Sequence, residues 1–267
     1  MRRLEAMFGR VRAAERAALI PYLTAGDPDL DVTADAIRAA VEAGADAVEV
    51  GVPFSDPMAD GPVLQRSAMR ALVSGTTVTG VLGLVESVRR HVDVPIVLFG
   101  YYNPIFRYGV EAFARAAASA GVDGVLCVDL PHEEAGELRM AALQEGLDLI
   151  ALLAPTTPPA RARAIARAAT GFLYFVSVLG VTGMRDTLPT ELPVLVERVR
   201  RLTTLPIGVG FGVQTPGQAG WVAGFADAVI VGSAVARRIE DAPPARVPAV
   251  VGDFVSELVQ GMRAVGR

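Results

Sequence analysis

The sequence is dominated by eight short apolar runs, each followed by a segment of helical spacing rich in Ala, Arg and Glu. The runs are 18–26, 46–51, 95–100, 124–130, 147–154, 172–178, 206–212 and 227–232. They are almost continuously apolar, which is typical of strands covered on both faces, and the helical segments between them exclude a meander of hairpins. Eight evenly spaced units in 267 residues predict an α/β fold, a (β/α)8 TIM barrel, which typically takes about 250 residues. A doubly wound sheet is the alternative, and the even spacing favours closure.

Segments outside the eight units extend this barrel at both ends. Residues 1–18 alternate charged and apolar side chains, which predicts an amphipathic helix and not a signal peptide. A last helix is expected near 247–264. No linker or low-complexity segment divides the chain, so residues 1–267 are expected to form a single barrel domain with extra N-terminal and C-terminal helices.

Three of the units share one local pattern, in which Ala-Gly and an Asp precede an apolar strand. The segments are AGADAVEVG, AGVDGVLCVDL and AGFADAVIVG. We interpret this as the repeat of one βα unit and not as a solenoid, which would need many more copies.

Composition narrows the chemistry that the chain can perform. All 25 Lys+Arg residues are arginines, so no side chain can form a Schiff base with a carbonyl substrate or with pyridoxal phosphate. His91 and His132 are the only histidines and Cys127 is the only cysteine. Neither a metal site nor an internal disulfide is therefore expected, and the chemistry must use carboxylates, a tyrosine, hydroxyls or backbone groups.

Charge and hydropathy also limit the partners. The formal net charge is -4, without a basic stripe or an acidic tail, so neither a nucleic acid nor an anionic membrane is an expected partner. The longest apolar stretches are far shorter than the roughly 18 residues that span a bilayer. The single cysteine agrees with a reducing compartment, so we expect a cytoplasmic protein.

Glu49 is the first candidate catalytic residue. In the run 46–51, Val48 and Val50 share one face, so Glu49 points into the barrel lumen if the valines face the helices. Loss of hydration there would raise the pKa of its carboxyl group, so that it could carry a proton near neutral pH. The alternative is a structural glutamate paired with a buried arginine, but no arginine lies at a strand end except Arg185, which is in a long loop.

Asp60 ends the loop VPFSDPMADGP, which follows the strand of Glu49 and precedes a helix. Taken alone, this residue is equally well read as a helix N-cap or a turn aspartate. Asp56 is still more typical of a turn. Only the proximity of Asp60 to Glu49 along the chain indicates a catalytic role.

Glycine-rich segments follow the last three strands: GVTG, GVGFGVQTP and VGSA. Glycines let backbone N–H groups approach an oxyanion, and a following helix N-terminus adds favourable partial charge. Barrels often bind phosphate after strands seven and eight. These segments therefore predict a phosphate site, with simple turn glycines as the alternative.

The remaining reactive side chains have structural interpretations. Tyr174 is a strand aromatic, whose usual role is core packing, and Cys127 and Trp221 also look structural. A solvated or capping role is expected for His132 at a helix start. His91 precedes the third strand, at the opposite end of the barrel from the expected site.

Together these motifs resemble the alpha subunit of tryptophan synthase over nearly the full chain. The matching segments are PYLTAGDP at 21–28, VEVGVPFSDPMADGP at 48–62, GVDGVLCVDLP at 121–131, GVTGMR at 180–185, and GVGFGVQTP at 208–216 followed by VGSA. The resemblance implies a lyase of L-tryptophan biosynthesis that cleaves indole-3-glycerol phosphate to indole and glyceraldehyde 3-phosphate. It also implies a beta subunit partner in an alpha2beta2 complex. Pyridoxal phosphate is expected on that partner and no cofactor on this chain.

The resemblance further implies roles for individual residues. Glu49 and Asp60 would be the catalytic carboxylates, with Tyr174 beside them in the site. The phosphate would lie on Gly183, Phe211, Gly212, Gly232 and Ser233, and Tyr22 and Thr182 would line the substrate pocket. Residues 101–104 and 184–188 are not fixed by the family pattern, so details of the indole pocket are left open.

Other interpretations are kept beside this one. Another phosphosugar barrel enzyme, such as an isomerase, fits the fold equally well, because barrels host many reactions. A lysine-dependent indole-glycerol-phosphate synthase is disfavoured because the chain contains no lysine. A binding module that mainly activates a partner is a different class of hypothesis, and an assay of the isolated chain would separate it from an enzyme.

Overall fold

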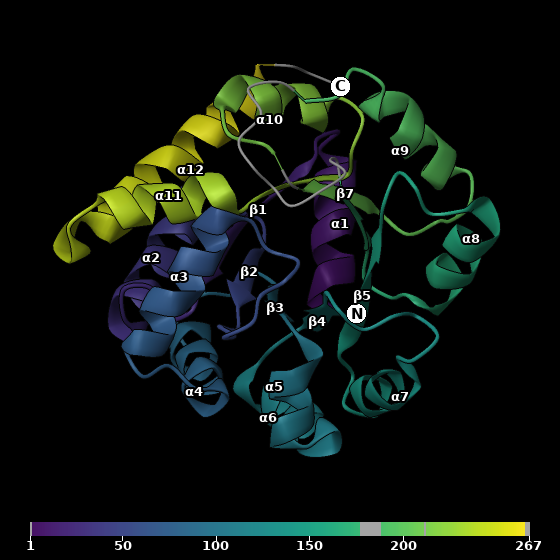
Figure 1. The fold of residues 1–267 in the computed structure, drawn as a ribbon. Coiled ribbons are helices and arrows are strands. Elements are labelled where there is room, and N and C mark those ends of the chain that lie inside the picture. Colours follow the sequence, from purple (N-terminus) through teal and green to yellow (C-terminus); the bar gives the residue numbers. More distant parts are fainter. Residues whose placement is uncertain (1, 177–187, 211, 265–267) are drawn as a thin grey trace.

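The computed structural model describes residues 2–176, 188–210 and 212–264. Within these ranges, parallel strands close into a barrel in chain order, as the sequence predicts (Figure 1). The strands are β1 (Ala18–Thr24), β2 (Val48–Gly51), β3 (Ile96–Gly100), β4 (Gly124–Cys127), β5 (Asp148–Leu153), β6 (Leu173–Val176), β7 (Ile207–Gly210) and β8 (Ala228–Val231).

Helices surround the barrel and connect its strands. They are α1 (Arg3–Ala13), α2 (Leu30–Glu42), α3 (Pro62–Val73), α4 (Val78–Arg89), α5 (Tyr102–Tyr108), α6 (Val110–Ala120), α7 (Gly136–Gln144), α8 (Pro159–Ala168), α9 (Leu192–Arg200), α10 (Pro216–Ala223), α11 (Ser233–Asp241), the 3-10 helix η1 (Pro244–Arg246) and α12 (Val247–Arg263). No single helix in the described ranges is long and apolar enough to cross a bilayer. The consecutive helices α3 and α4, bent by 95° at their junction, meet that length and composition only as a pair.

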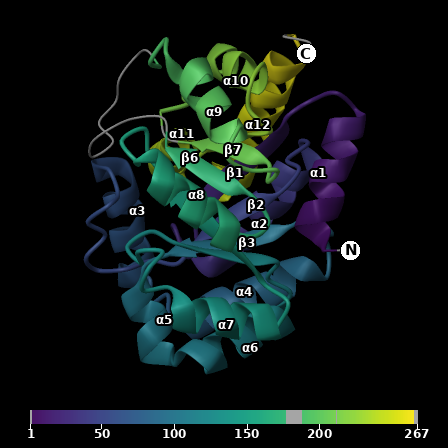
Figure 2. The same ribbon diagram turned by 90° about the vertical axis from the view of Figure 1, so that its right-hand side faces the viewer.

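The two predicted extra helices are present and pack differently. In Figure 2, α1 and α3 lie on opposite sides of the barrel. The side with α1 is the one where the strands begin. Its apolar side chains are buried together with lumen residues, and the rings of Phe8 and Phe172 are 5.7 Å apart. By contrast, α12 packs between α2 and α10 and completes the outer ring of helices.

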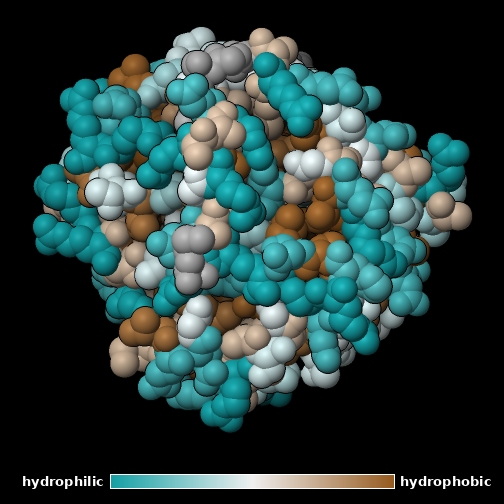
Figure 3. Space-filling model, turned by 180° about the vertical axis from the view of Figure 1, so that it is seen from behind, coloured by the Kyte–Doolittle hydropathy of each residue, from teal (hydrophilic) through white to brown (hydrophobic). Residues whose placement is uncertain are grey.

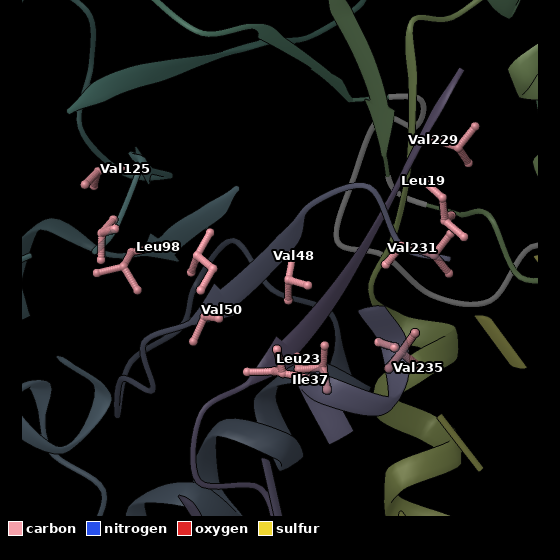
Figure 4. Close-up of a cluster of buried hydrophobic side chains, with 14 of the residues drawn as sticks. Leu19, Leu23, Ile37, Val48, Val50, Leu98, Val125, Val229, Val231 and Val235 are labelled. Atoms are coloured by element: carbon pink, nitrogen blue, oxygen red, sulfur yellow. The ribbon is translucent and has the colours of Figure 1, made fainter. Parts of the chain in front are cut away.

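The barrel has two apolar clusters, one between its strands and the surrounding helices and one in its lumen. Figure 4 shows part of the layer between strands and helices, in which Val48 and Val50 of β2 lie with Leu19, Leu98 and Val125. A second cluster fills the lumen with residues of the opposite parity, among them Ala47, next to Val48, and Val97, which pairs with Glu49. The side chain of Glu49 therefore faces the lumen, as strand alternation predicts.

The repeated Ala-Gly and Asp pattern has a structural role where the strands begin. In each unit the aspartate accepts a hydrogen bond from the backbone N–H of a neighbouring strand and pairs with an arginine. The three sets are Asp46 with Leu19 and Arg16, Asp123 with Ile96 and Arg89, and Asp227 with Ile207 and Arg200, all at 2.7–3.0 Å. The surface seen from behind the view of Figure 1 is largely hydrophilic, with hydrophobic side chains in scattered hollows (Figure 3).

Candidate active site

Glu49 lies in the middle of β2 and is almost completely buried, with 1% of its surface exposed. Its Oε1 has no hydrogen-bond partner among the described residues. Burial raises the pKa of this carboxyl to about 8, because the charged form loses its hydration. No arginine of the described ranges pairs with Glu49, so the structural alternative of a buried ion pair is not found there. Near neutral pH this group carries a proton that it can donate.

Asp60 directly precedes α3 but does not cap that helix. The N-cap is Gly61, so the interpretation of Asp60 as a capping residue is wrong. Its Oδ2 accepts a hydrogen bond from the Tyr101 hydroxyl at 3.0 Å, and its Oδ1 is buried without a partner in the described residues. Burial raises the pKa of Asp60 to about 6, and the hydrogen bond from Tyr101 opposes this rise. Asp60 is therefore mostly ionised at neutral pH, while Glu49 is mostly protonated.

Tyr101 is a site residue that the sequence analysis missed. Its hydroxyl donates to Asp60 and accepts the backbone N–H of Ala59 at 3.0 Å, and its ring lies 5.3 Å from that of Phe54. Tyr101 thus holds both ends of the loop that carries Asp60. It follows directly after β3, the neighbour of β2, and its position at the carboxyl end of a barrel strand was the available signal.

Two tyrosines of the lumen each lie across a glycine of the next strand. The Tyr22 hydroxyl would be 2.1 Å from a Cβ at Gly51, and the Tyr174 hydroxyl 2.0 Å from a Cβ at Gly210. Any larger residue at either position would collide with the ring, so these glycines make room for the tyrosines. Gly51 and Gly210 were also missed, because their role depends on which side chain crosses them.

Electrostatic interactions connect the carboxyl groups and the tyrosines into one cluster. Burial raises the pKa of the Tyr174 hydroxyl, and the nearby charges of Glu49 and Asp60 raise it further. The pKa of Tyr22 is raised by burial and then by the same two carboxylates. The barrel therefore brings together the predicted residues Glu49, Asp60, Tyr22 and Tyr174 at the carboxyl ends of its strands.

The described part of the predicted phosphate site lies at the ends of β7 and β8, which pair with each other. Gly212 follows β7 with φ of 91°, Gly232 is the N-cap of α11, and Ser233 is the first residue of that helix. A Cβ at Gly232 would lie 3.6 Å from the Cβ of Tyr22, so this helix N-terminus is adjacent to the lumen cluster. A half-buried helix N-terminus of this kind is a natural anion site. Thr182, Gly183 and Phe211 lie outside the described residues.

The other reactive residues occupy different places. His91 is exposed and precedes β3, on the side of the barrel where the strands begin. His132 is half-buried and contacts Arg139. The part of the chain that the structure describes contains no group of three or more His, Cys, Asp or Glu side chains that could hold a metal ion. The expectation that this chain uses no metal or cofactor stays a prediction.

Fold and site together define a barrel protein whose carboxyl end combines buried, unpaired acids with a helix N-terminus suited to an anion. A family model described as "Tryptophan synthase alpha chain" matches residues 8–262. The tryptophan synthase alpha chain of Geotalea uraniireducens (strain Rf4) is 49% identical over 266 residues and covers 100% of both chains.

Solved structures agree with these sequence relationships. The crystal structure of tryptophan synthase subunit alpha from Legionella pneumophila str. Paris matches with a TM-score of 0.92 and 38% identity, over 99% of each chain. A structure described as the tryptophan synthase a2b2 complex from Pyrococcus furiosus matches with a TM-score of 0.87 and 40% identity, over 92% of this chain and 99% of that chain.

The chain belongs to the tryptophan synthase alpha chain family, as the sequence motifs indicate. It is an enzyme subunit of tryptophan biosynthesis, and its family catalyses the alpha reaction, the cleavage of indole-3-glycerol phosphate to indole and glyceraldehyde 3-phosphate.

Proposed function

We propose that this chain is a carbon-carbon lyase in which Glu49 and Asp60 are the catalytic carboxylates of the alpha reaction. The observation that carries the proposal is the pair itself. Both carboxyl groups are buried at the carboxyl end of the barrel, and each keeps one oxygen without a partner in the described residues. Their pKa values, about 8 and about 6, give them opposite protonation states at neutral pH. Such a separation is typical of an acid and a stabilising anion that act together.

The reaction begins with protonation of the indole ring. Protonated Glu49 transfers its proton to C3 of indole, and the ring becomes a cation with positive charge at its N–H group. Ionised Asp60 stabilises that charge, which develops in a buried site where electrostatic interactions are strong. The cationic ring is then the electron sink for cleavage.

The second step gives Glu49 a new proton, which comes from the substrate. Its carboxylate now accepts the proton of the hydroxyl on the glycerol carbon attached to C3, and the O–H electrons form the aldehyde carbonyl. The bond between that carbon and C3 breaks, and its electron pair neutralises the ring. Indole and glyceraldehyde 3-phosphate leave with Glu49 protonated again, so the step consumes no water, oxidant or reductant.

Neighbouring residues orient the acids and the substrate. Tyr101 fixes Asp60 through its hydroxyl, while the rings of Tyr22 and Tyr174 form walls that exclude water. Gly212, Gly232 and Ser233 would bind the substrate phosphate through backbone N–H groups, together with Gly183 and Phe211. Thr182 would complete the substrate pocket.

A beta subunit is the proposed partner, in an alpha2beta2 complex. The support is the Pyrococcus furiosus relative, which was solved as an a2b2 complex. Two large apolar side chains near the site, Met58 and Phe106, are 82% and 60% exposed, as suits a surface that another protein covers. Pyridoxal phosphate would be bound by the partner, since this chain has no lysine to anchor it. The cytoplasmic location stays a prediction.

The test is to incubate the isolated chain with indole-3-glycerol phosphate and measure the release of indole. We expect indole from the unmodified chain, almost none from Glu49→Gln, and normal release from Asp56→Asn, whose carboxylate lies exposed in the same loop. Titration with purified beta subunit then tests the partner, with complex formation followed by ultracentrifugation. A chain that releases no indole, alone or with the beta subunit, would refute the lyase assignment.

A further inference from the structure

The described residues contain three buried side-chain polar atoms without a hydrogen-bond partner. Two are Glu49 Oε1 and Asp60 Oδ1, in the candidate active site, and the third is Nε of Arg139. Buried polar atoms nearly always have partners, so each exception calls for an explanation. The property that marks the candidate active site thus occurs at one more place, in α7.

Arg139 lines a cavity of about 260 Å³ on the outer face of the barrel. Its lining residues come from β4, β5, α7 and α8 and from the segments beside them. Figure 1 shows α7 and α8 outside β5. Aliphatic residues form a large part of its wall, among them Leu149, Ala151, Ile165, Ala168 and Ala169. His132, Arg139, Arg161 and Asp129 add the polar groups. A cavity of this size is slightly smaller than the usual range of about 300–1,000 Å³ for ligand sites, so its ligand must be small.

The Arg139 guanidinium has a buried donor, Nε, without a partner among the described residues. Nη2 donates to the carbonyl oxygen of His132 at 3.0 Å and lies 3.3 Å from Nδ1 of the same residue. In the part of the chain that the structure describes, no carboxylate forms an ion pair with Arg139, whereas Arg161 pairs with exposed Glu133 at 2.9 Å.

Charge limits what this cavity can accept. Among its lining residues Arg139 and Arg161 are cationic and Asp129 is anionic, and Glu133 beside the cavity already pairs with Arg161. One Asp129 oxygen already accepts from the backbone N–H of Tyr102 at 2.7 Å and from the Cys127 thiol at 3.4 Å. Arg139 is thus the lining cation without an ion-pair partner among the described residues, and a single carboxylate would supply that partner, while a phosphate dianion would bring a second negative charge toward Asp129.

We propose that this cavity binds a small monocarboxylate with one ring or a short apolar chain. The carboxylate would accept hydrogen bonds from Arg139, whose planar fork matches it, and the apolar part would lie on the aliphatic wall. The candidate active site also offers an anion site, at the N-terminus of α11, so the test must distinguish the two places.

Benzoate and its neutral isostere benzamide are the probes, and calorimetric titration of the full chain is the measurement. We expect saturable millimolar binding of benzoate and binding of benzamide about tenfold weaker. Arg139→Met keeps the apolar stem of the side chain and should weaken benzoate about tenfold without affecting benzamide. Arg163→Met, an exposed position on α8, is the matched control and should bind as the unmodified chain does.

Several results would overturn the proposal. They are the lack of saturable benzoate binding at millimolar concentration, equal affinity for benzamide, unchanged binding in Arg139→Met, and displacement of benzoate by indole, which would place the probe in the active site. If Arg139→Met does not fold, a crystal of the unmodified chain soaked in 4-bromobenzoate replaces it. Bromine anomalous signal between α7 and α8 supports the site, and signal elsewhere or none refutes it.

Discussion

The two ends of the barrel use acidic side chains in opposite ways. Where the strands begin, Asp46, Asp123 and Asp227 each pair with an arginine and accept a backbone N–H. Where the strands end, Glu49 and Asp60 are more deeply buried but have no arginine partner in the described ranges. The first group of acids holds neighbouring strands and helices together. The second group keeps its charge or its proton available for a substrate.

This difference has a cost in stability that depends on pH. Glu49 has an ordinary pKa of 4.5 and a folded-state pKa of about 8, so between these values the folded state binds more protons than the unfolded state. The free energy of unfolding therefore falls as pH rises through this window. At pH 7 the loss amounts to roughly 3 kcal/mol. Perturbed carboxyl groups of this kind cluster at functional sites, which agrees with the proposed role of Glu49.

The largest expected effect is on turnover, in Glu49→Gln. The amide keeps the size of the side chain but cannot donate and recover a proton, so kcat/KM for indole release should fall about 10³ to 10⁴-fold. Steady-state assay of indole checks this, and phosphate-dependent ligand binding should remain. Turnover within tenfold of the unmodified chain would remove Glu49 from the role of proton donor.

Asp60→Asn should have the next largest effect. The amide cannot stabilise the cationic ring, and loss of one such electrostatic interaction typically costs about 10² to 10³-fold in kcat. The comparison is Asp46→Asn at the other end of the barrel, which should leave kcat unchanged in the folded fraction. If both variants lose turnover equally, the two ends are not functionally distinct.

Stability should respond with opposite signs at the two ends. Glu49→Gln removes the buried ionisable group, so at pH 7 it should raise the free energy of unfolding by up to roughly 3 kcal/mol, with no gain at pH 4. Asp123→Asn removes charge from a carboxylate that pairs with Arg89 at 2.7 Å and Arg3 at 3.1 Å, and should cost about 2–3 kcal/mol. Urea unfolding at both pH values measures the two effects. A loss of stability in both variants at pH 7 would contradict the expected difference in sign between the two ends.

The sequence predicts the barrel and the direction of Glu49 because both depend on local pattern. Eight near-continuous apolar runs specify strands that are covered on both faces, and the period of two places Glu49 opposite Val48 and Val50. The role of the repeated aspartates could not be predicted in the same way. Their arginine partners lie 27 to 34 residues away in the sequence, so the pairing depends on the closed barrel.

Contacts of the site itself were only partly predictable. Asp60 was identified by the family motif, but its environment depends on Tyr101, which lies 41 residues later in a segment that the family pattern does not fix. The roles of Gly51 and Gly210 could not be predicted from the sequence, because these glycines act by leaving space for Tyr22 and Tyr174. The role of each of these positions depends on a residue that is its neighbour only in the folded structure.

Tyr101→Phe is the smallest and most specific change at the end of the barrel where the strands end. The proposed mechanism needs Asp60 ionised and Glu49 protonated, so kcat/KM should be maximal between about pH 6 and about pH 8. Without the hydroxyl, Asp60 loses the hydrogen bond that lowers its pKa, so the acid limb should move to higher pH while the alkaline limb stays. At pH 6 we expect a loss of about tenfold, roughly the value of one hydrogen bond to a charged group.

Tyr102→Phe is the matched control for this change. The Tyr102 hydroxyl bonds Glu137 at 3.3 Å, away from Asp60, so neither limb of the profile should move. A merely structural role of Tyr101 would lower activity at every pH without displacing the acid limb. Only a displaced acid limb with a constant alkaline limb would show that Tyr101 holds Asp60 in its charged form, and a shift of both limbs would mean that Glu49 and Asp60 titrate as one coupled pair.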